Sequence, residues 1–494
     1  MAFAGLDVGT SRCKLLVYDL DGNILFSKSR SYKETGDRGL RELDPEKVII
    51  EVKEVLKDAG RNCPVKIEAL AVTSLGESIV CLDKDGRSLA NSMLTGDRRG
   101  IEEAERLAGE ITPLEVMEIT GLPLSEMYGL PKYMWLNENT NAIKDANAIF
   151  FYEDYVGYML TGKRIVSYSS AARSMAFDIN KKQWSEKLLS YAGIRMEQMS
   201  TPVESGTVIG TVLPEIAKEL HINEDMKIVV GGHDQSCAAL GSGLTDPSVC
   251  ECGMGTCEFM YIMLPKAVKS QYMIENSLTC VPYFFPETYL TSLEVTTCGI
   301  LKNWSRETIL KGIDMECRQR DEDFYAYIDK AIDNIRTDVM VLPQFGSSGN
   351  PDNNYDVKGT ITGLTVHTRP EEIYRAILEG IVFQMYLSYE TALQIGVKPE
   401  KIIATGGGAM SDVNLQIHAD IFNMNVVTTT SVEAGALACM ILAATGVNAY
   451  PSLKEGMERA IKVKKEIKPD REMHEYYMEK YEKFKKLYES MHLF

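Results

Sequence analysis

Three glycine turns in this sequence have the composition of loops that hold phosphate groups. Each follows an apolar stretch that is predicted to be a β-strand: Asp7-Val-Gly-Thr-Ser11, Gly253-Met-Gly-Thr256 and Thr405-Gly-Gly-Gly-Ala409. Glycine lets backbone N–H groups approach a phosphate closely, and Thr and Ser hydroxyls add donors. A single turn of this kind is usually structural, but three together predict a nucleotide cleft between domains. Asp7 precedes the first turn, and a carboxylate there suits Mg²⁺, held directly or through water.

A candidate catalytic group lies at the end of another apolar strand, in Val229-Val-Gly-Gly-His-Asp-Gln-Ser236. Asp234 there can accept a proton from an attacking hydroxyl, and the start of the small-residue helix that follows keeps it ionised. The alternative is that Asp234 only caps this helix, since Asp is a good N-cap residue. His233 is expected to be a packing or hydrogen-bonding neighbour.

The segment Gly157-Tyr-Met-Leu-Thr-Gly-Lys163 matches most of a P-loop. Arg164, however, stands where a P-loop has the Ser or Thr that binds Mg²⁺, and no Val- and Ile-rich strand leads into the segment. We predict a helix end instead, with Gly162 as its stop.

The 11 cysteines are an odd number and contain no Cys-x-x-Cys pair. The densest group is Cys250, Cys252 and Cys257, and a metal site there would need a fourth ligand at a recognisable spacing, which the neighbouring sequence lacks. Small buried core residues in a reducing compartment are therefore the favoured interpretation over a disulfide framework.

The elements that position these residues occur twice. The pattern strand, Gly-Thr turn, strand at Phe3–Tyr18 returns at Cys250–Tyr261, about half a chain length later. We therefore predict two similarly built α/β domains, 1–244 and 245–494, with the seam in the glycine- and proline-containing stretch Gly243-Leu-Thr-Asp-Pro247.

Local signals predict several further elements. They are an Asp21-Gly22 hairpin turn, a helix capped by Asp44 with Pro45 at its first position, a strand over 65–73, an Asp85-Gly86 turn, a long helix begun by the capping box Thr368-Arg-Pro-Glu371, a strand over 402–404, and an amphipathic helical tail carrying Tyr476, Tyr477, Tyr481, Phe484 and Leu487.

The composition of the chain argues against several functional classes. The 494 residues include 53 Lys and Arg against 70 Asp and Glu, a net charge of −17 that disfavours nucleic acid and anionic membranes as partners. The longest apolar run, 434–447, suits a buried helix better than a membrane span. The N-terminus does not resemble a signal peptide, because Asp7 interrupts its apolar stretch. We expect a soluble, cytoplasmic protein.

Over essentially its full length, the chain resembles the FGGY family of carbohydrate kinases, which includes glycerol kinase and xylulose kinase. The blocks that carry the resemblance are Gly5–Thr10, Gly96–Arg99, Lys132–Leu136, Leu160–Gly162, Gly231–Gln235, Gly253–Thr256, Gly359–His367 with Arg375–Gly380, Thr405–Ser411, Gln416–Asp420 and Glu433–Ala436. The resemblance implies two actin-like (ribonuclease H-like) ATPase domains that close over MgATP and a sugar or polyol.

The resemblance also implies roles for single residues. Asp234 matches the catalytic base and Asp7 the metal-side carboxylate. The matches to nucleotide contacts are Thr10, Ser11 and Lys14 in the first phosphate loop, Gly255 and Thr256 in the second, and Gly407 and Ser411 at the adenosine. Lys14 stands where relatives often have Arg.

The substrate loop is Thr73-Ser-Leu-Gly-Glu-Ser78. Xylulose kinases carry Gln-Met-His in this place and glycerol kinases Gln-Arg-Glu, so this chain keeps only the acid, Glu77, and has Gly76 for the Arg. Glu77, Gly76 and Gln235 are expected to contact substrate, with an exposed loop as the alternative for Glu77. Asp97 and Arg99 match the family's Asp-x-Arg, which implies an ion pair in the pocket wall, and both are expected among the substrate-binding residues.

We expect an ATP-dependent kinase of a small ketose, with pentuloses such as xylulose first, because Gly-Gly-His-Asp-Gln is similar to that branch. The loop Gly346-Ser-Ser-Gly-Asn-Pro351 departs from the Gly-Glu-Arg-x-Pro of many relatives, which weakens a simple xylulose assignment. Glycerol, erythritol or another polyol is the alternative substrate, and a non-catalytic actin-like nucleotide-binding protein the alternative class. A homodimer is the ordinary expectation.

Overall fold

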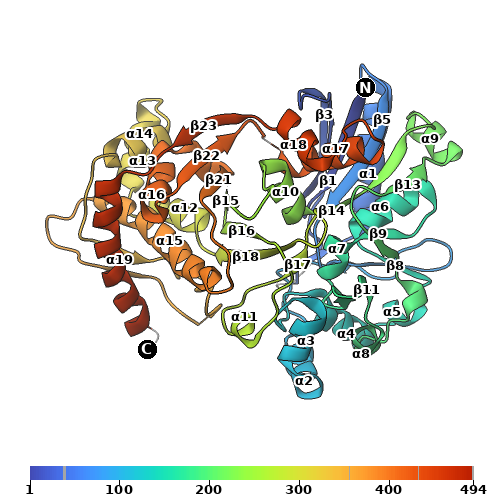
Figure 1. Ribbon diagram of the computed structural model, residues 1–494, viewed down its shortest axis with the longest axis horizontal. Coiled ribbons are helices and arrows are strands. Elements are labelled where there is room, and N and C mark those ends of the chain that lie inside the picture. Colours follow the sequence, from blue (N-terminus) through green and yellow to red (C-terminus); the bar gives the residue numbers. More distant parts are fainter. Residues whose placement is uncertain (37–39, 355, 432, 492–494) are drawn as a thin grey trace.

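The computed structural model describes residues 1–36, 40–354, 356–431 and 433–491, and its longer strands form two sheets, one from each half of the chain (Figure 1). The first sheet has the order β13-β14-β5-β1-β2-β3. Its strands are β1 (Ala2–Val8), β2 (Arg12–Tyr18), β3 (Ile24–Ser31), β5 (Ile67–Ser74), β13 (Val208–Thr211) and β14 (Lys227–His233). β1, β5 and β14 run parallel to their neighbours in this group, whereas β2, β3 and β13 are antiparallel to theirs.

The second sheet repeats this topology, with the order β17-β18-β16-β15-β21-β22-β23. Its strands are β15 (Val249–Met254), β16 (Glu258–Leu264), β17 (Val281–Pro282), β18 (Tyr289–Val295), β21 (Lys401–Thr405), β22 (Asn425–Thr429) and β23 (Val463–Ile467). The β15–β16 hairpin corresponds to β1–β2, the parallel strands β21 and β22 to β5 and β14, and the antiparallel edge β23 to β13. The predicted duplication is therefore confirmed in strand order and direction.

Strand β1 is buried on both faces, as its almost continuous apolar sequence requires. On one face its residues share a hydrophobic core with helix α1 (Pro45–Asn62), whose Val48, Val52 and Val55 are buried. Asp44 caps this helix as predicted, and its side chain accepts hydrogen bonds from the backbone N–H groups of Glu46 and Lys47. This packing fixes the end of β1 and therefore the position of the glycine turn that follows it.

The other face of the first sheet is covered by a helix from the second half of the chain, α17 (Ala434–Gly446), which packs against β1, β5 and α10 (Asp234–Ser242). Figure 1 shows this red helix beside the blue N-terminal strands. The contact is close, because a Cβ atom built on Gly5 would fall 1.9 Å from the carbonyl oxygen of Ala436. Glycine at this position thus permits the two halves to join through backbone contact.

The second sheet is covered by α15 (Pro370–Leu393) and α16 (Asp412–Phe422). The tail helix α19 (Arg471–Met491) packs on these two helices, and its Tyr477, Tyr481 and Phe484 are buried as predicted. The predicted start of α15 is wrong by one residue. Its N-cap is Arg369, whose backbone N–H donates to Glu372 Oε2 at 2.7 Å. The residue before a proline favours extended backbone, so Arg369 takes the non-helical N-cap position before Pro370.

The predicted helix end at Gly162 is confirmed, since α6 (Tyr152–Thr161) stops there with Gly162 at φ 71°. The remaining helices are α2 (Ile101–Glu110), α3 (Pro113–Thr120), α4 (Gly129–Asn139), α5 (Ala142–Asp145), α7 (Tyr168–Ala172), α8 (Glu186–Tyr191), α9 (Pro214–Leu220), α11 (Gln271–Glu275), α12 (Gly299–Glu307), α13 (Lys311–Gln319), α14 (Phe324–Ile332) and α18 (Leu453–Ala460). The short strands are β4 (Glu42–Leu43), β6 (Val80–Leu82), β7 (Ser92–Met93), β8 (Ala148–Phe150), β9 (Ile165–Ser167), β10 (Phe177–Asp178), β11 (Gln183–Trp184), β12 (Thr201–Val203), β19 (Met340–Leu342) and β20 (Thr360–Thr362). Within the described ranges, no helix combines the length and apolar character needed to cross a bilayer.

Candidate active site

Two large cavities lie where the sequence places its candidate residues. The first, here the acidic cavity, has a volume of about 570 Å³ and is lined by the turn after β1, the ends of β5 and β14, and residues of β16 and β18. The second, the glycine-lined cavity, has a volume of about 610 Å³ and is formed by residues of the second half, including Gly255, Gly299, Gly407 and Gly408. Both halves of the chain therefore contribute to the acidic cavity.

Asp234 lines the acidic cavity as the first residue of α10. The expected alternative, a capping role, is wrong, because His233 holds the N-cap position and makes no side-chain cap bond. Asp234 Oδ1 instead accepts the backbone N–H of Gln235 at 2.6 Å. Burial raises the pKa of Asp234 to about 7, and the charges of Asp7 and Glu77 add to the rise. A half-protonated carboxylate at neutral pH can accept a proton from a hydroxyl.

The glycine pair before His233 lets β14 approach its neighbours. A Cβ atom on Gly231 would fall 1.9 Å from the carbonyl oxygen of Val72 in β5. His233 Nε2 lies 3.0 Å from Asp234 Oδ1, and the backbone N–H of His233 donates to Ser169 Oγ at 3.1 Å. Burial lowers the pKa of His233 to about 3, so its ring is neutral and is no counter-ion for Asp234.

Glu77 lies in the acidic cavity and is buried, so the alternative of an exposed loop is wrong. Its carboxylate accepts hydrogen bonds from Thr95 Oγ1 at 2.6 Å and Arg173 Nε at 2.5 Å. Burial alone would raise the pKa of Glu77, but the Arg173 guanidinium holds it below its usual value. Gly76 also lines the cavity, and a Cβ atom there would be 2.8 Å from the His233 ring and 3.0 Å from Arg173 Cγ.

Arg173 was missed by sequence reasoning, because no motif surrounds it. It reaches the cavity just beyond α7, and its guanidinium stacks over the Tyr128 ring at 4.9 Å. Tyr128 is buried and also lines the cavity. The position of Arg173 therefore depends on contacts between segments that are distant in sequence.

Lys132 on α4 holds the loops that form this wall. Its Nζ donates to the carbonyl oxygens of Leu94 at 3.0 Å, Thr95 at 2.9 Å and Met127 at 3.0 Å. Burial lowers the pKa of Lys132 to about 8, with Glu77 opposing. Thr95 and Met127 line the cavity, so this buried cation fixes their backbone.

Asp97 and Arg99 do not line the acidic cavity. Arg99 Nε donates to Asp97 Oδ1 at 2.9 Å, and Arg99 also pairs with Glu42 at 2.7 Å. The backbone N–H of Arg41 donates to Asp97 Oδ2 at 2.9 Å. The two residues thus form the expected ion pair. The pair lies outside the lining of the acidic cavity, so a direct substrate contact has no geometric support here.

The first glycine turn brings Asp7, Gly9 and Thr10 to the acidic cavity, together with Gln235. Burial raises the pKa of Asp7 to about 6, and the charge of Glu433 adds to the rise. Its neighbours Ser11 and Lys14 are not part of the lining. Lys14 forms an ion pair with Glu433.

Asp7 suits a hard cation. Mg²⁺ is usually held in proteins by one or two carboxylates together with substrate phosphates and water, and Asp7, a single carboxylate beside a glycine turn, fits such a site. Burial and the charge of Glu433 raise the pKa of Asp7 more than Arg12 and Lys14 lower it, and a bound cation would favour the ionised form further.

The glycine-lined cavity contains all four residues expected there: Gly255, Thr256, Gly407 and Ser411. Ser411 also caps α16, since its Oγ accepts the backbone N–H of Asn414 at 3.1 Å. Sequence reasoning missed other residues that line this cavity, among them Lys302, Asn303, Tyr325 and Asp329. They lie on α12 and α14, which carry no recognisable motif.

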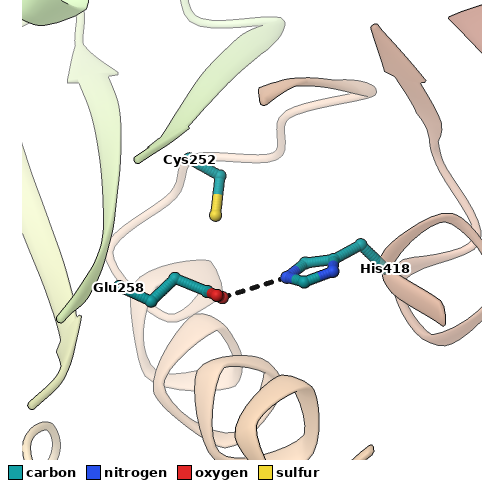
Figure 2. A group of neighbouring side chains, drawn as sticks. All are labelled: Cys252, Glu258 and His418. Carbon is teal, nitrogen blue, oxygen red and sulfur yellow. Dashed lines mark hydrogen bonds and ion pairs between the residues drawn. The ribbon is translucent and has the colours of Figure 1, made fainter. Parts of the chain in front are cut away.

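A buried group lies beside this cavity and joins Cys252, Glu258 and His418, whose potential metal-ligating atoms are within 4.8 Å of one another (Figure 2). His418 Nε2 is 3.0 Å from Glu258 Oε1, and Nδ1 is 2.7 Å from the carbonyl oxygen of Asn414. Burial would raise the pKa of Glu258, but His418 holds it below its usual value. The group is therefore a buried His–Glu pair whose polar atoms are satisfied by hydrogen bonds, and Cys250 and Cys257 are not part of it.

Comparison with known proteins agrees with this geometry. Residues 2–241 match the N-terminal domain model of the FGGY family of carbohydrate kinases, and residues 250–447 match its C-terminal domain model. The chain is 25% identical to a xylulose kinase of Bacillus subtilis over 491 residues, which is 98% of this chain and 96% of that protein. It is also 25% identical to a gluconokinase of Bacillus subtilis over 445 residues, 89% of this chain and 86% of that protein.

A crystal structure of ligand-bound xylulose kinase from Lactobacillus acidophilus has a TM-score of 0.89, with 25% identity over 99% of this chain and 98% of that chain. The fold is thus the two-domain actin-like fold, as predicted. Family and fold together establish a phosphotransferase that uses ATP and has an alcohol group of a small sugar as acceptor. The chain belongs to the FGGY family of carbohydrate kinases.

Proposed function

We propose that this kinase transfers the γ-phosphate of ATP to a hydroxyl group of a pentulose such as xylulose, with Asp234 as the general base. The observation that carries the proposal is the position of Asp234, at the start of α10 and in the same cavity as Asp7. Its elevated pKa of about 7 also suits a base that works at neutral pH.

The remaining residues have roles in alignment. Thr10, Gly255 and Thr256 would hold the phosphates, while Gly407 and Ser411 would contact the adenosine. Asp7 would hold Mg²⁺, which supplies charge neutralisation at the transferring phosphate when bound. Asp234 orients the acceptor hydroxyl in line with the phosphate and accepts its proton late, since the transition state of phosphoryl transfer is loose.

At the acceptor end, Glu77, Gly76 and Gln235 would contact the sugar, and Arg173 joins them. Gly76 stands where glycerol kinases have an arginine in sequence. In space, the Arg173 side chain lies beside this position, since its Cγ is 3.0 Å from a Cβ atom built there, with the His233 ring at 2.8 Å. An arginine beside Glu77 favours glycerol, erythritol or another polyol as the second candidate substrate.

We also propose the domain limits 1–244 and 245–494. The support is that each half supplies all strands of one large sheet, and that α10 ends at Gly243, whose φ is 118°. Helix α17 then belongs to the second domain in sequence while packing on the first sheet.

The experiment that tests the substrate is ADP release in a coupled assay against pentuloses, hexuloses, tetritols and glycerol. We expect one pentulose to stimulate ATP turnover far above the other compounds. Strongest stimulation by a polyol would replace xylulose with the second candidate. No stimulation by any compound, with MgATP still bound, would contradict the proposal and favour a non-catalytic nucleotide-binding protein.

A further inference from the structure

One wall of the acidic cavity is built by two neighbouring strands of the second sheet. Alternate residues of a strand point to the same face, and the lining includes Phe259 and Tyr261 of β16 and Leu290, Ser292 and Glu294 of β18. Phe259 pairs with Glu294 across the strands, and Tyr261 pairs with Ser292. Glu294 is therefore the charged residue of a wall that is otherwise aromatic, aliphatic or hydroxylic.

The backbone of Glu294 is held tightly. Its N–H donates to Asn350 Oδ1 at 2.7 Å, and its carbonyl oxygen accepts the N–H of Asn350 at 3.2 Å. Gly349 approaches the same carbonyl so closely that a Cβ atom would fall 2.1 Å from it. The loop 346–351, which departs from the family pattern in sequence, thus fixes the strand position that carries this carboxylate.

The carboxylate itself has no hydrogen-bond or ion-pair partner among the described residues. Burial raises the pKa of Glu294 to about 7, although the Arg173 guanidinium opposes the rise. Arg173 cannot neutralise it fully, because Nε and Nη2 of Arg173 already face Glu77. A fixed, partly desolvated acceptor without a donor is suited to bind donors from a ligand.

The charges that line the cavity are unbalanced. Four carboxylates lie there, from Asp7, Glu77, Asp234 and Glu294, against the single cation Arg173. His233 is neutral, because its pKa is lowered to about 3. Mg²⁺ at Asp7 would act at the phosphate end. Above pH 7, where Glu294 is mostly ionised, its charge on this wall therefore faces no cation of the lining other than Arg173.

We propose that Glu294 determines acceptor specificity: it accepts hydrogen bonds from hydroxyl groups of an uncharged sugar or polyol, and its charge excludes acceptors that carry a carboxylate, such as aldonates. The inference rests on the proposed function of the acidic cavity as the acceptor site. Like charges in a water-poor site repel strongly, whereas a carboxylate can bind two neighbouring hydroxyls. The relatives include both a xylulose kinase, named for an uncharged sugar, and a gluconokinase, named for an acid. On this inference, Glu294 makes the present chain selective for uncharged acceptors.

The test compares pairs of compounds that differ mainly in one carboxylate, xylitol with xylonate and glycerol with glycerate, alongside xylulose and gluconate. Coupled ADP release is measured above pH 8, where Glu294 is ionised, for the wild-type protein and for Glu294→Gln, which keeps the side-chain shape. We expect wild-type turnover only with uncharged compounds. In Glu294→Gln, kcat/KM for the best uncharged acceptor falls at least about tenfold, mainly through KM, and the rate ratio of aldonate to uncharged partner rises.

Glu287→Gln is the matched control, because Glu287 is exposed, lies just before β18 and pairs with Lys182 outside the acidic cavity. It should leave KM and the rate ratio unchanged. Wild-type turnover of aldonates equal to that of their uncharged partners would overturn the inference while leaving the kinase assignment intact. An unchanged KM and ratio in Glu294→Gln would overturn it as well.

Thermal stabilisation in the presence of a non-hydrolysable ATP analogue separates this inference from the proposed function. If no compound is turned over but uncharged compounds alone stabilise the protein, the charge selection holds and the catalytic proposal fails. If aldonates stabilise it equally, or no compound does, the role of Glu294 is wrong.

Discussion

Asp234 and Asp7 share one cavity, and their protonation should control activity. In the proposed mechanism, Asp234 is ionised when it accepts the hydroxyl proton and Asp7 is ionised when it holds a cation. Burial raises the pKa of Asp234 to about 7 and that of Asp7 to about 6, so activity should be low in acid. Because the two carboxylates interact, a pH profile reports values that belong to the pair.

We therefore expect kcat/KM for the acceptor, measured at saturating MgATP, to rise with pH and to be half-maximal near pH 7. Rates in the coupled assay between pH 5 and pH 9 provide the measurement, with the coupling enzymes in excess at each pH. A flat profile over this range would contradict the assigned base.

The raised pKa of Asp234 affects stability in the opposite direction to activity. The folded protein keeps the Asp234 proton at pH values where the unfolded chain has released it, so the free energy of unfolding falls as pH rises from about 4 to 7. Asp234→Asn removes this contribution. The melting temperature of this variant should exceed that of the wild type at pH 8 and approach it at pH 4. Equal melting temperatures at pH 8 would show that the folded protein does not disfavour the ionised form of Asp234.

Residue chemistry was predicted best where it is local. Asp7, Asp234 and Glu77 stand at the ends of apolar strands, a signal that the sequence displays directly. Arg173 and Glu294 could not be found in this way, because each reaches the cavity through packing between segments that are distant in sequence. The ion pair of Asp97 and Arg99 was predicted and is present, but the two residues do not line the cavity.

At the scale of elements, capping and turn signals predicted α1, the end of α6 and the hairpins of both sheets. These signals depend on a few neighbouring residues and backbone preferences. The contact between α17 and β1 was not predictable, because its glycine and alanine partners lie in opposite halves of the chain. The requirement for glycine at position 5 therefore follows only from the packed structure.

Gly5→Ala should destabilise the protein by about 1–3 kcal/mol, because the added methyl group must displace the backbone of α17. Urea unfolding followed by tryptophan fluorescence and far-UV circular dichroism measures the change. Gly109→Ala is the control, since Gly109 lies in α2 with no atom within 4 Å of an added Cβ. We expect that variant to be neutral or more stable by up to about 1 kcal/mol; equal losses in the two variants would refute the packing argument.

At the scale of the whole molecule, the duplicated sheets form two domains, and the acidic cavity is lined from both. The repeated hairpin in the sequence predicted this duplication, and the strand orders bear it out. Closure of two such domains would exclude water from the phosphate, which limits wasteful hydrolysis of ATP. The sequence alone could not place β16 and β18 opposite Asp234, because that juxtaposition depends on how the halves pack.

The central claim is that sugar phosphorylation in this cavity depends on Asp234 and not on nucleotide binding alone. The most direct test measures sugar-dependent ADP release and ATP-analogue affinity in parallel for wild type and Asp234→Ala, with the best acceptor of the panel. We expect kcat to fall by about 100- to 10,000-fold while nucleotide affinity stays near the wild-type value. Retained turnover, or loss of nucleotide binding along with activity, would contradict the assignment of Asp234 as the base.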